Sequence, residues 1–274
     1  MEPSQMVIMA VVVILMLVAL FYLWKWLYGN SDEQDMVIYS SPSNGLPAKD
    51  TAATVYSGAQ VPQIYGGGEY SISTWIYVTN WTINKGKNKP FLVLSGGASE
   101  ASRLMTMVMY LGQYTNKLGV RVSVESSDNN IGNITFNKLQ SIIDGASPYS
   151  DSSSDFKKCD IEQVDLQKWV NITAVLSGRT LDIYIDGKLS RSCLLDGLFK
   201  VDGETPTMKL GGPDGFGGLI GMTRAANFAY SPDRVYSYYQ EGPFSSFSLS
   251  SLDPGSYSFD IKRKGSTIFS TSTK

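Results

Sequence analysis

Two aspartates in one alternating run are the residues whose spacing invites comparison with a hydrolytic pair. Asp182 and Asp186 lie four residues apart, on the same face of an expected strand. An extended chain rises about 3.3 Å per residue, so this spacing separates them by ~13 Å. Glycoside hydrolysis needs two carboxylates about 5–9 Å apart. The Asp186-Gly187 turn explains Asp186 better, so we expect no catalytic residues and no enzymatic activity.

The residue counts exclude several other classes of chemistry. The 274 residues include no histidine, which rules out Ser-His-Asp and Cys-His nucleophiles, HExxH zinc sites and histidine proton shuttles near neutral pH. Two cysteines cannot form a four-cysteine zinc site. The 23 basic and 25 acidic residues nearly cancel, so no global positive field indicates a nucleic-acid partner.

Cys159 and Cys193 are the two cysteines of the chain. We predict a disulfide between them. It would close a loop of about 35 residues and contribute roughly 3–4 kcal/mol of stability. The alternative is a pair of buried free thiols in a reducing compartment.

Clusters of acidic residues raise the question of a calcium ion, because calcium takes oxygen ligands from Asp, Glu and Asn. Two groups of such residues fall on expected loops. The first is Asp151, Asp155, Asp160, Glu162 and Asp165, and the second is Asp128, Asn129 and Asn130. Ordinary solvated loops explain both groups equally well. We therefore name no metal ligand and predict no cofactor, with calcium as the open alternative.

The amino-terminal residues contain a long uncharged run. Met6 to Trp24 is a 19-residue stretch without a charged residue. At about 1.5 Å per helical residue it nearly spans the ~30 Å hydrocarbon core of a bilayer. Aromatic residues and a lysine, which are typical of a membrane interface, gather at its carboxyl end: Trp24, Lys25, Trp26 and Tyr28. The pattern predicts a transmembrane anchor over residues 1–29 and a polar stalk over 30–35.

A cleaved signal peptide is the competing interpretation of this run. Such a peptide needs a basic amino-terminal region and a cleavage site of small residues after a shorter apolar core. The residues before Met6 are acidic rather than basic, and bulky residues follow Trp24. We therefore expect an uncleaved, single-pass anchor whose partner is the lipid bilayer.

Two patterns disagree about the side of the membrane on which the rest of the chain lies. Lys25 follows the run and no basic residue precedes it, which weakly favours a cytosolic carboxyl-terminal portion. Three glycosylation sequons, at Asn80, Asn133 and Asn171, suit the lumenal side. Asn171 falls in an expected strand, where a glycan would fit badly. The sequence leaves the side open.

Short alternating or β-branched runs fill residues 36–243, separated by Gly, Asn, Asp and Ser. This pattern predicts one all-β domain, an antiparallel sandwich or barrel. Tyr70–Val78 alternates clearly, and Asp186-Gly187 between two runs predicts a hairpin. The other expected strands are residues 90–94, 104–111, 117–124, 169–176, 180–185 and 188–193.

One helix is expected near the end of this domain. Ser231 supplies an N-cap, Pro232 the first helical position and Gly242 a stop, so we predict a helix between them. Its expected buried stripe is Val235, Tyr238 and Tyr239. Residues 244–274 form a Ser/Thr-rich tail in which the runs 257–261 and 267–270 alternate enough to form an edge hairpin.

Residues Lys168–Leu176 and Leu181–Leu189 resemble the "W-x-x-(I/V)-T … L-x-(I/L)-Y-(I/V)-D-G-K" core of concanavalin A-like lectin/glucanase domains, close to the laminin G-like group. Tyr70–Val78 is similar to that group's "F-S-(I/V)-S-x-W-(I/V)" strand. Gly217–Ile220 with Tyr230–Val235 is similar to its closing segment. The resemblance implies a concanavalin A-like, jelly-roll sandwich over 36–243. The E-x-D-x-x-E motif of the related glucanases is absent, in line with the expected lack of activity.

A narrower resemblance joins this domain to the anchor. Together with Arg191–Leu195, Leu210–Gly212 and a glycine-rich segment around Phe216, the chain looks like membrane-anchored proteins of large icosahedral DNA viruses with an internal membrane. The resemblance implies a minor capsid or virion membrane protein that links the internal membrane to capsid proteins, and that sits in a host membrane during assembly. Relatives of such viruses often bring a thiol oxidase, so a cytosolic disulfide would be no contradiction. The alternative is a membrane-displayed lectin that binds glycans.

Overall fold

The computed structural model of the chain describes residues 3–28, 33–96, 105–124, 156–195, 197–201, 205–245, 258–263 and 266–272. The chain forms two compact units, Met1–Glu33 and Gln34–Lys274. The boundary falls inside the segment expected to be a stalk. Gln34 and Asp35 therefore belong to the second unit.

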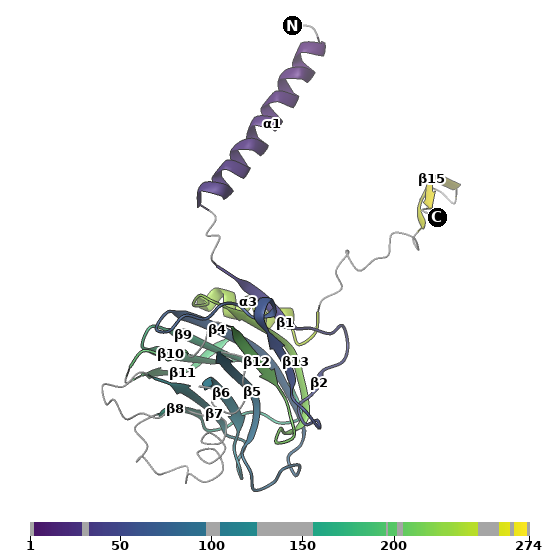
Figure 1. Cartoon of the computed structure of the whole chain (residues 1–274). Helices are drawn as coiled ribbons and strands as arrows, with labels where there is room; N and C mark the ends of the chain where they lie inside the picture. Colours follow the sequence, from purple (N-terminus) through teal and green to yellow (C-terminus); the bar gives the residue numbers. More distant parts are fainter. Residues whose placement is uncertain are drawn as a thin grey trace. The chain divides into compact units, whose positions relative to one another are not determined.

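The first unit contains helix α1, Pro3–Tyr28, which is continuous over 26 residues (Figure 1). The side chains described within it are Met9 and residues 12–23, all of them exposed. In the described ranges, no helix combines the length and the apolar character needed to cross a membrane. Trp24, Lys25, Trp26 and Tyr28 fall within α1, but their side chains lie outside the described set.

The second unit is built almost entirely from strands. Two sheets contain, in chain order, β1 (Asp35–Tyr39), β2 (Leu46–Pro47), β3 (Thr54–Ser57), β4 (Glu69–Asn80), β5 (Lys89–Gly96), β6 (Met105–Leu111), β7 (Leu118–Ser123), β8 (Phe156–Ile161), β9 (Trp169–Ser177), β10 (Thr180–Ile185), β11 (Lys188–Leu194), β12 (Pro206–Leu210) and β13 (Gly217–Ala226). A short 3₁₀ turn, Gly58–Gln60, follows β3, and helix α3 (Pro232–Glu241) follows β13.

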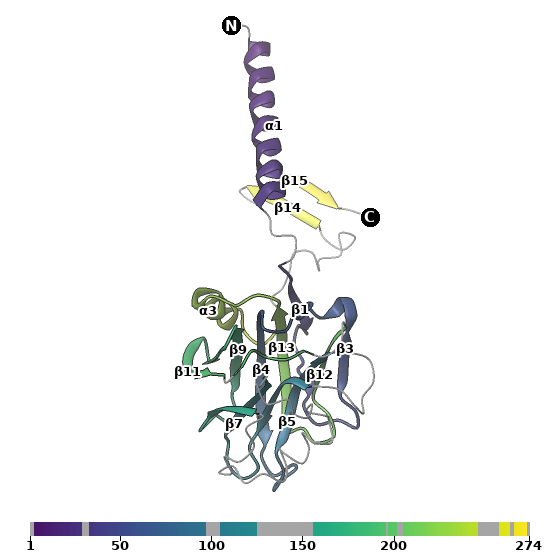
Figure 2. The same ribbon diagram turned by 60° about the vertical axis from the view of Figure 1, so that its left-hand side comes forward.

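The strands form two layered sheets (Figures 1 and 2). The first sheet has the order β1-β13-β4-β9-β10-β11, with β2 also paired to β13. The second has the order β3-β12-β5-β6-β7-β8. Every named pair of strands is antiparallel. The prediction of an all-β antiparallel sandwich is confirmed.

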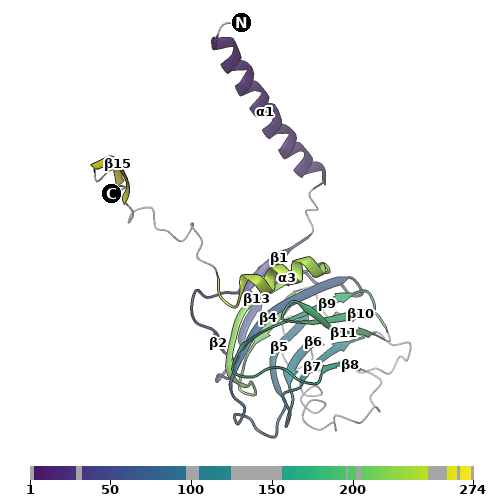
Figure 3. The same cartoon turned by 180° about the vertical axis from the view of Figure 1, so that it is seen from behind.

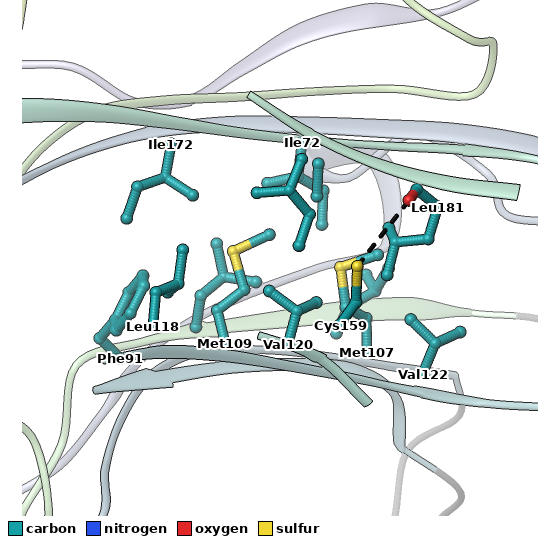
Figure 4. Packing of buried hydrophobic residues seen from close by; sticks show 14 of the residues in the cluster. Ile72, Phe91, Met107, Met109, Leu118, Val120, Val122, Cys159, Ile172 and Leu181 are labelled. Atoms are coloured by element: carbon teal, nitrogen blue, oxygen red, sulfur yellow. Dashed lines mark hydrogen bonds between the residues drawn. The ribbon is translucent and has the colours of Figure 1, made fainter. Parts of the chain in front are cut away.

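The hydrophobic core lies between the two sheets (Figure 4). Ile72, Ile172 and Leu181 of the first sheet face Met109, Val120 and other apolar residues of the second. The largest wholly buried aromatic side chains of this core are Tyr70, Phe91, Phe199 and Phe216. Alternate residues of each strand point to opposite faces, so the period-2 pattern of the sequence fixes which residues enter the core.

The strongest hairpin signal in the sequence is confirmed. Strand β10 pairs with β9 on one side and with β11 on the other. Asp186 and Gly187 join β10 to β11 with positive φ angles of 50° and 75°. Such a two-residue turn favours glycine at its second position, because no Cβ obstructs the left-handed conformation there.

Six strands have no counterpart among the predicted runs: β1, β2, β3, β8, β12 and β13. Strand β8 overturns an expectation about Asp160, which the sequence placed on an acidic loop. Asp160 instead pairs with Gly119 of β7 inside the second sheet. The lysines of β8, at 157 and 158, interrupt the apolar alternation that would have marked it as a strand.

The carboxyl-terminal tail contains a hairpin close to the one expected. Strands β14 (Ser258–Arg263) and β15 (Ser266–Ser272) form a separate two-stranded sheet that joins neither sheet of the sandwich. The first residues of the tail are attached to the sandwich unit, because the backbone N–H of Ser245 donates to the carbonyl of Ser41 at 3.0 Å.

Candidate functional site

Helix α3 lies against the first sheet (Figure 3) and begins as the sequence predicts. The Ser231 side chain accepts a hydrogen bond from the Arg234 N–H at 3.4 Å, Pro232 occupies the first turn, and Gly242 follows the last residue with a φ of 84°. These groups satisfy free backbone ends and suit both termini of a helix. Val235 is wholly buried beneath the helix.

A carboxylate at the start of β1 holds α3 to the sheet. The Asp35 carboxylate accepts hydrogen bonds from the Tyr230 hydroxyl at 3.0 Å and from the Tyr238 hydroxyl. The Arg234 guanidinium lies 3.9 Å from the same carboxylate. Asp35 also pairs with Ala226 of β13, so this residue connects β1, β13 and α3.

The neighbouring residue adds backbone contacts to this junction. The N–H of Gln34 donates to the Asn227 side chain at 2.7 Å, and the N–H of Asn227 donates to the Gln34 carbonyl at 3.1 Å. The Gln34 side chain accepts from the N–H of Gln63 at 3.0 Å. We call the set Gln34, Asp35, Asn227, Tyr230 and Tyr238 the junction clamp.

The junction clamp changes the acidity of its tyrosines. Burial raises the pKa of Tyr238 to about 12, and the Asp35 carboxylate adds to the rise because it accepts the hydroxyl proton and repels a phenolate. Burial and Asp35 also raise the pKa of Tyr230. Both hydroxyls therefore remain protonated donors across the physiological range, and the clamp stays closed there.

An aromatic layer covers the middle of the same sheet face. Trp75 of β4 stacks on Tyr239 of α3, with ring centroids 5.7 Å apart. Trp169 contacts Tyr77 at 5.4 Å and Phe244 at 5.2 Å. Side chains on both faces of β4 are therefore buried, one set in the core and the other beneath α3 and the segment that follows it.

The second sheet carries a charged cluster on the face that points away from the core. The Arg121 guanidinium of β7 donates twice to the Asp160 carboxylate of β8, and the Lys117 ammonium pairs with the same group. The Tyr110 ring lies 5.2 Å from the Arg121 guanidinium. Burial alone would raise the pKa of Asp160, but hydrogen bonds and charge from Arg121 and Lys117 outweigh it and hold that pKa below its ordinary value.

This face is not an open sheet surface. Tyr110 and Arg121 are each 7% exposed, and Val108 and Thr106 are wholly buried or nearly so. A sugar that stacked on this face would need exposed aromatic rings and free polar groups. The described residues of this face are instead buried.

A buried lysine occupies the loop end of the sandwich. Lys89, at the start of β5, is wholly buried, and its ammonium donates to the carbonyl of Gly112 at 3.0 Å and to that of Lys87 at 3.3 Å. The ring of Trp81 covers the ammonium at 4.2 Å. Burial lowers the pKa of Lys89. The cage ties the β4–β5 loop to the β6–β7 turn.

The predicted disulfide is confirmed. Cys159 of β8 and Cys193 of β11 are bonded, with their Cα atoms 6.0 Å apart. The bond joins an edge strand of one sheet to an edge strand of the other. The Arg191 guanidinium reinforces this link, because it donates to the carbonyl of Asp160 at 2.7 Å.

The structure separates the three sequons. Asn80 is exposed at the end of β4, whereas Asn171 is wholly buried in β9. The Asn171 amide donates to the Ser73 hydroxyl at 3.2 Å, so the folded domain has no room for a glycan there. Asn171 is therefore withdrawn as a candidate. Asn133 lies outside the described residues.

Some residues considered as calcium ligands have cationic partners instead. Asp160 is paired with Arg121 and Lys117, and Asp165 is paired with Lys168 at 2.6 Å. Within the residues that the structure describes, no cluster of three or more His, Cys, Asp or Glu could hold a metal ion. Outside the described residues lie Asp128, Asn129, Asn130, Asp151 and Asp155.

The sequence did not reveal the junction clamp or the Lys89 cage. The partners of Asp35 lie 195 and 203 residues away, so no local pattern connects them. Lys89 occupies an ordinary polar position beside a proline. One signal was available for the clamp, because Tyr238 was expected on the buried stripe of the helix, where its hydroxyl would need a partner.

Comparisons with known proteins find loose structural likenesses. No family model and no curated protein matches the chain. The binding domain of botulinum neurotoxin serotype D is 11% identical with a TM-score of 0.45, over 76% of this chain and 46% of that one. The serotype G binding domain is 14% identical with a TM-score of 0.44, over 74% and 50%.

A third solved structure is the binding domain of botulinum neurotoxin DC in complex with SialylT. It is 13% identical with a TM-score of 0.43, over 74% of this chain and 52% of that one. This chain thus spans about half the length of the structures it matches. Likenesses this loose carry no argument about what the chain binds.

Proposed function

We propose that the chain is a non-enzymatic structural protein, held to a membrane by its amino-terminal helix, whose sandwich binds proteins of a layer beside that membrane. In the setting implied by the resemblance to proteins of large DNA viruses, the membrane is internal to the virion and the layer is the capsid. The chain is then a minor capsid or virion membrane protein.

The junction clamp is the observation that carries this proposal. A tether transmits load into a domain at the residue where the domain begins. The second unit begins at Gln34, and Gln34 and Asp35 are joined to β13, to α3 and to Gln63. A mechanical load applied at Gln34 would therefore be borne by β13, α3 and Gln63 together, and would not act on β1 alone.

The sequence of α1 supports the membrane part of the proposal. Met6 to Trp24 contains no charged residue, and these residues fall within one continuous helix. A run of this length and composition suits the hydrocarbon core of a bilayer. Every described side chain in it is exposed, as expected of a segment whose surroundings are lipid.

The carboxyl-terminal hairpin supports the binding part. A two-stranded hairpin alone is marginally stable in water, whereas added strands stabilise it. Strands β14 and β15 pair only with each other within the described sheets, which leaves both outer edges of the hairpin available for strand addition by a neighbour.

Membrane flotation of the full chain tests the tether. We expect the native chain to float with vesicles and to resist alkaline carbonate extraction. Replacing Leu15 and Val18 together with lysine places two charges in the uncharged run, which should release the chain, because each charge at mid-bilayer costs about 2.5–3.5 kcal/mol. Leu15→Ile with Val18→Ile is the matched control and should float. Recovery of the native chain in solution without residues 6–24 would contradict the tether.

Cross-linking in the intact particle or membrane tests the partner. Capsid proteins, or other proteins of a layer beside the membrane, should be captured through the second unit and should remain with detergent-stripped shells. A glycan array with the full chain in detergent tests the lectin alternative. Tight, calcium-dependent binding of one glycan would favour that alternative over the structural role.

A further inference from the structure

Asn80 is the one sequon that the described structure leaves open to modification. Asn80 ends β4, and its side chain is exposed, whereas Asn171 is buried and hydrogen-bonded in the middle of β9. A glycan attached to Asn171 during synthesis would prevent β9 from pairing with β4. The folded second unit can therefore carry a glycan at Asn80 but not at Asn171, although the two sequons look alike in sequence.

The local geometry at Asn80 presents its amide nitrogen. The Asn80 side-chain oxygen accepts hydrogen bonds from the Thr82 N–H at 2.8 Å and from the Thr82 hydroxyl at 2.7 Å. Among the described residues, the Asn80 amide nitrogen makes no hydrogen bond. The sequon hydroxyl thus holds the oxygen of the acceptor amide, while the nitrogen that would receive a sugar points to no partner.

Contacts with buried residues fix the turn that contains Asn80. Trp81, the middle residue of the sequon, covers the buried Lys89 ammonium. Lys89 in turn donates to two backbone carbonyls of adjacent loops. Asn80 itself pairs with Gly217 of β13. A glycan at Asn80 would therefore extend from a fixed turn without disturbing the core.

We propose that Asn80 carries an N-linked glycan, and that the second unit accordingly lies on the lumenal side of the membrane that holds it. The inference rests on the tether of the proposed function for the membrane, and it requires that the protein layer bound by the sandwich lie on the same, lumenal side. It overrides the weak opposing signal, which is the single residue Lys25 beyond the uncharged run.

The modification is a transfer of a sugar to an amide. The Asn80 amide nitrogen attacks the anomeric carbon of an oligosaccharide linked to a lipid diphosphate. A carbon–nitrogen bond forms, the bond between that carbon and the diphosphate oxygen breaks, and the lipid diphosphate leaves. The amide nitrogen loses one proton to a base of the transferase. The lipid-linked oligosaccharide is the required co-reactant, and it is available on the lumenal side.

The disulfide is a separate observation that agrees with a lumenal second unit. Cys159 and Cys193 are bonded between the two sheets, with exposed fractions of 0% and 7%. Such disulfides form and persist in oxidising compartments. The disulfide alone does not decide the side, because a dedicated thiol oxidase could form it elsewhere. The glycan does, since its donor is confined to the lumen.

Translation of the full chain with microsomes that contain an oligosaccharyltransferase tests the inference. Asn133→Gln serves as the starting variant, so that the sequons at Asn80 and Asn171 remain. We expect one slower-migrating band that an endoglycosidase removes. Asn80→Gln should abolish the band and Asn171→Gln should leave it. Thr82→Ala should abolish it as well, whereas Thr82→Ser, which keeps the hydroxyl, should retain it.

Two outcomes would overturn the inference. One is a chain that is retained in the microsomal membrane but shows no glycan in the Asn133→Gln background. The other is a glycan band that disappears with Asn171→Gln and not with Asn80→Gln. Carbonate extraction of the same samples separates this result from the tether. An extracted, glycosylated chain would contradict the tether alone, and a retained, unmodified chain would contradict the glycan alone.

Discussion

Two carboxylates, Asp35 and Asp160, each join several elements of the sandwich, but they do so with opposite partners. Asp160 is held by the guanidinium of Arg121 and the ammonium of Lys117, inside a sheet. Asp35 is held chiefly by the hydroxyls of two tyrosines, at the edge of the molecule where the second unit begins. In the first arrangement two cationic side chains neutralise a carboxylate that is largely buried. In the second, two neutral hydroxyls donate hydrogen bonds to a carboxylate that is partly exposed.

Because the partners of the two carboxylates differ, we expect acid to weaken the contacts of Asp160 and alkali to weaken those of Asp35. A carboxylate whose folded pKa lies below its ordinary value contributes stability above that value, and the contribution is lost as pH falls through the folded pKa. Asp160 is such a group. A tyrosine whose pKa is raised contributes stability that is lost as pH rises above its ordinary value of about 10. The tyrosines of the junction clamp are such groups.

Asp160→Asn should break the first junction and give the largest effect. It leaves Arg121 buried without a counter-charge, and removal of one partner from a buried pair costs about 3–5 kcal/mol. Urea unfolding of the full chain in detergent measures this loss. Below pH 4 the difference from the native chain should narrow, because the native Asp160 also becomes protonated. Asp165→Asn, at a side chain 62% exposed, is the control and should cost less than about 1 kcal/mol. Equal losses in both variants would refute the comparison.

Replacing both Cys159 and Cys193 with alanine should cost about 3–4 kcal/mol, since the bond closes a loop with a sequence separation of 34. The same unfolding measurement applies. Cys159 adjoins Asp160, so the two links are expected to act as one unit. The variant that combines all three substitutions should therefore lose less than the sum of the separate losses. Strict additivity would show that the links are independent.

Asp35→Asn should weaken the junction clamp by about 1–2 kcal/mol, because an amide replaces the charged acceptor of two hydroxyl hydrogen bonds. Hydrogen exchange is the more specific measurement. The amides of β1 and α3 should lose protection, while those of β6 and β7 should not change. Glu162→Gln, at an exposed carboxylate outside the clamp, is the control. Uniform loss of protection across the sandwich would mean that Asp35 has no local role.

Tyr110→Phe should give the smallest effect, visible only at alkaline pH. Burial raises the pKa of Tyr110 to about 12, and the charge of Asp160 adds to the rise against that of Arg121. Between pH 10 and 12 the unfolded chain ionises this tyrosine and the folded chain does not, so stability falls as pH rises. The phenylalanine variant should lose less stability over that interval. Tyr114→Phe, at a side chain 73% exposed, should follow the native chain. Parallel curves for all three proteins would contradict the prediction.

The parts of the fold that the sequence predicted are those governed by local pattern. The paired strands β9, β10 and β11 follow from alternation and from the Asp186-Gly187 turn, and α3 follows from Ser231 and Gly242. The disulfide followed from there being two cysteines. Each of these features depends on residues close in sequence or on a count of residues.

The features that the sequence did not predict depend on residues that are far apart in the chain. Strand β8 has lysines where an apolar residue would mark a strand, and the remainder of the sheet supplies the stability it lacks. Asp35 contacts Tyr230 and Tyr238 in a fold in which β1 pairs with β13, far away in the sequence. Trp75 and Tyr77 show the same limit, because their alternation indicates a second face of β4 but not the aromatic rings that cover it.

The junction clamp also determines where the sandwich can be cut free. A soluble version that starts at Glu33 would retain Gln34 and Asp35, and with them the bonds to Asn227, Tyr230 and Tyr238. A version that starts at Met36 would lack those bonds, and α3 would be left with fewer attachments to the sheet. Cleavage by a protease before Gln34 would thus release a sandwich with its junction clamp complete. Cleavage just after Asp35 would release a sandwich that lacks Gln34 and Asp35 and is less stable.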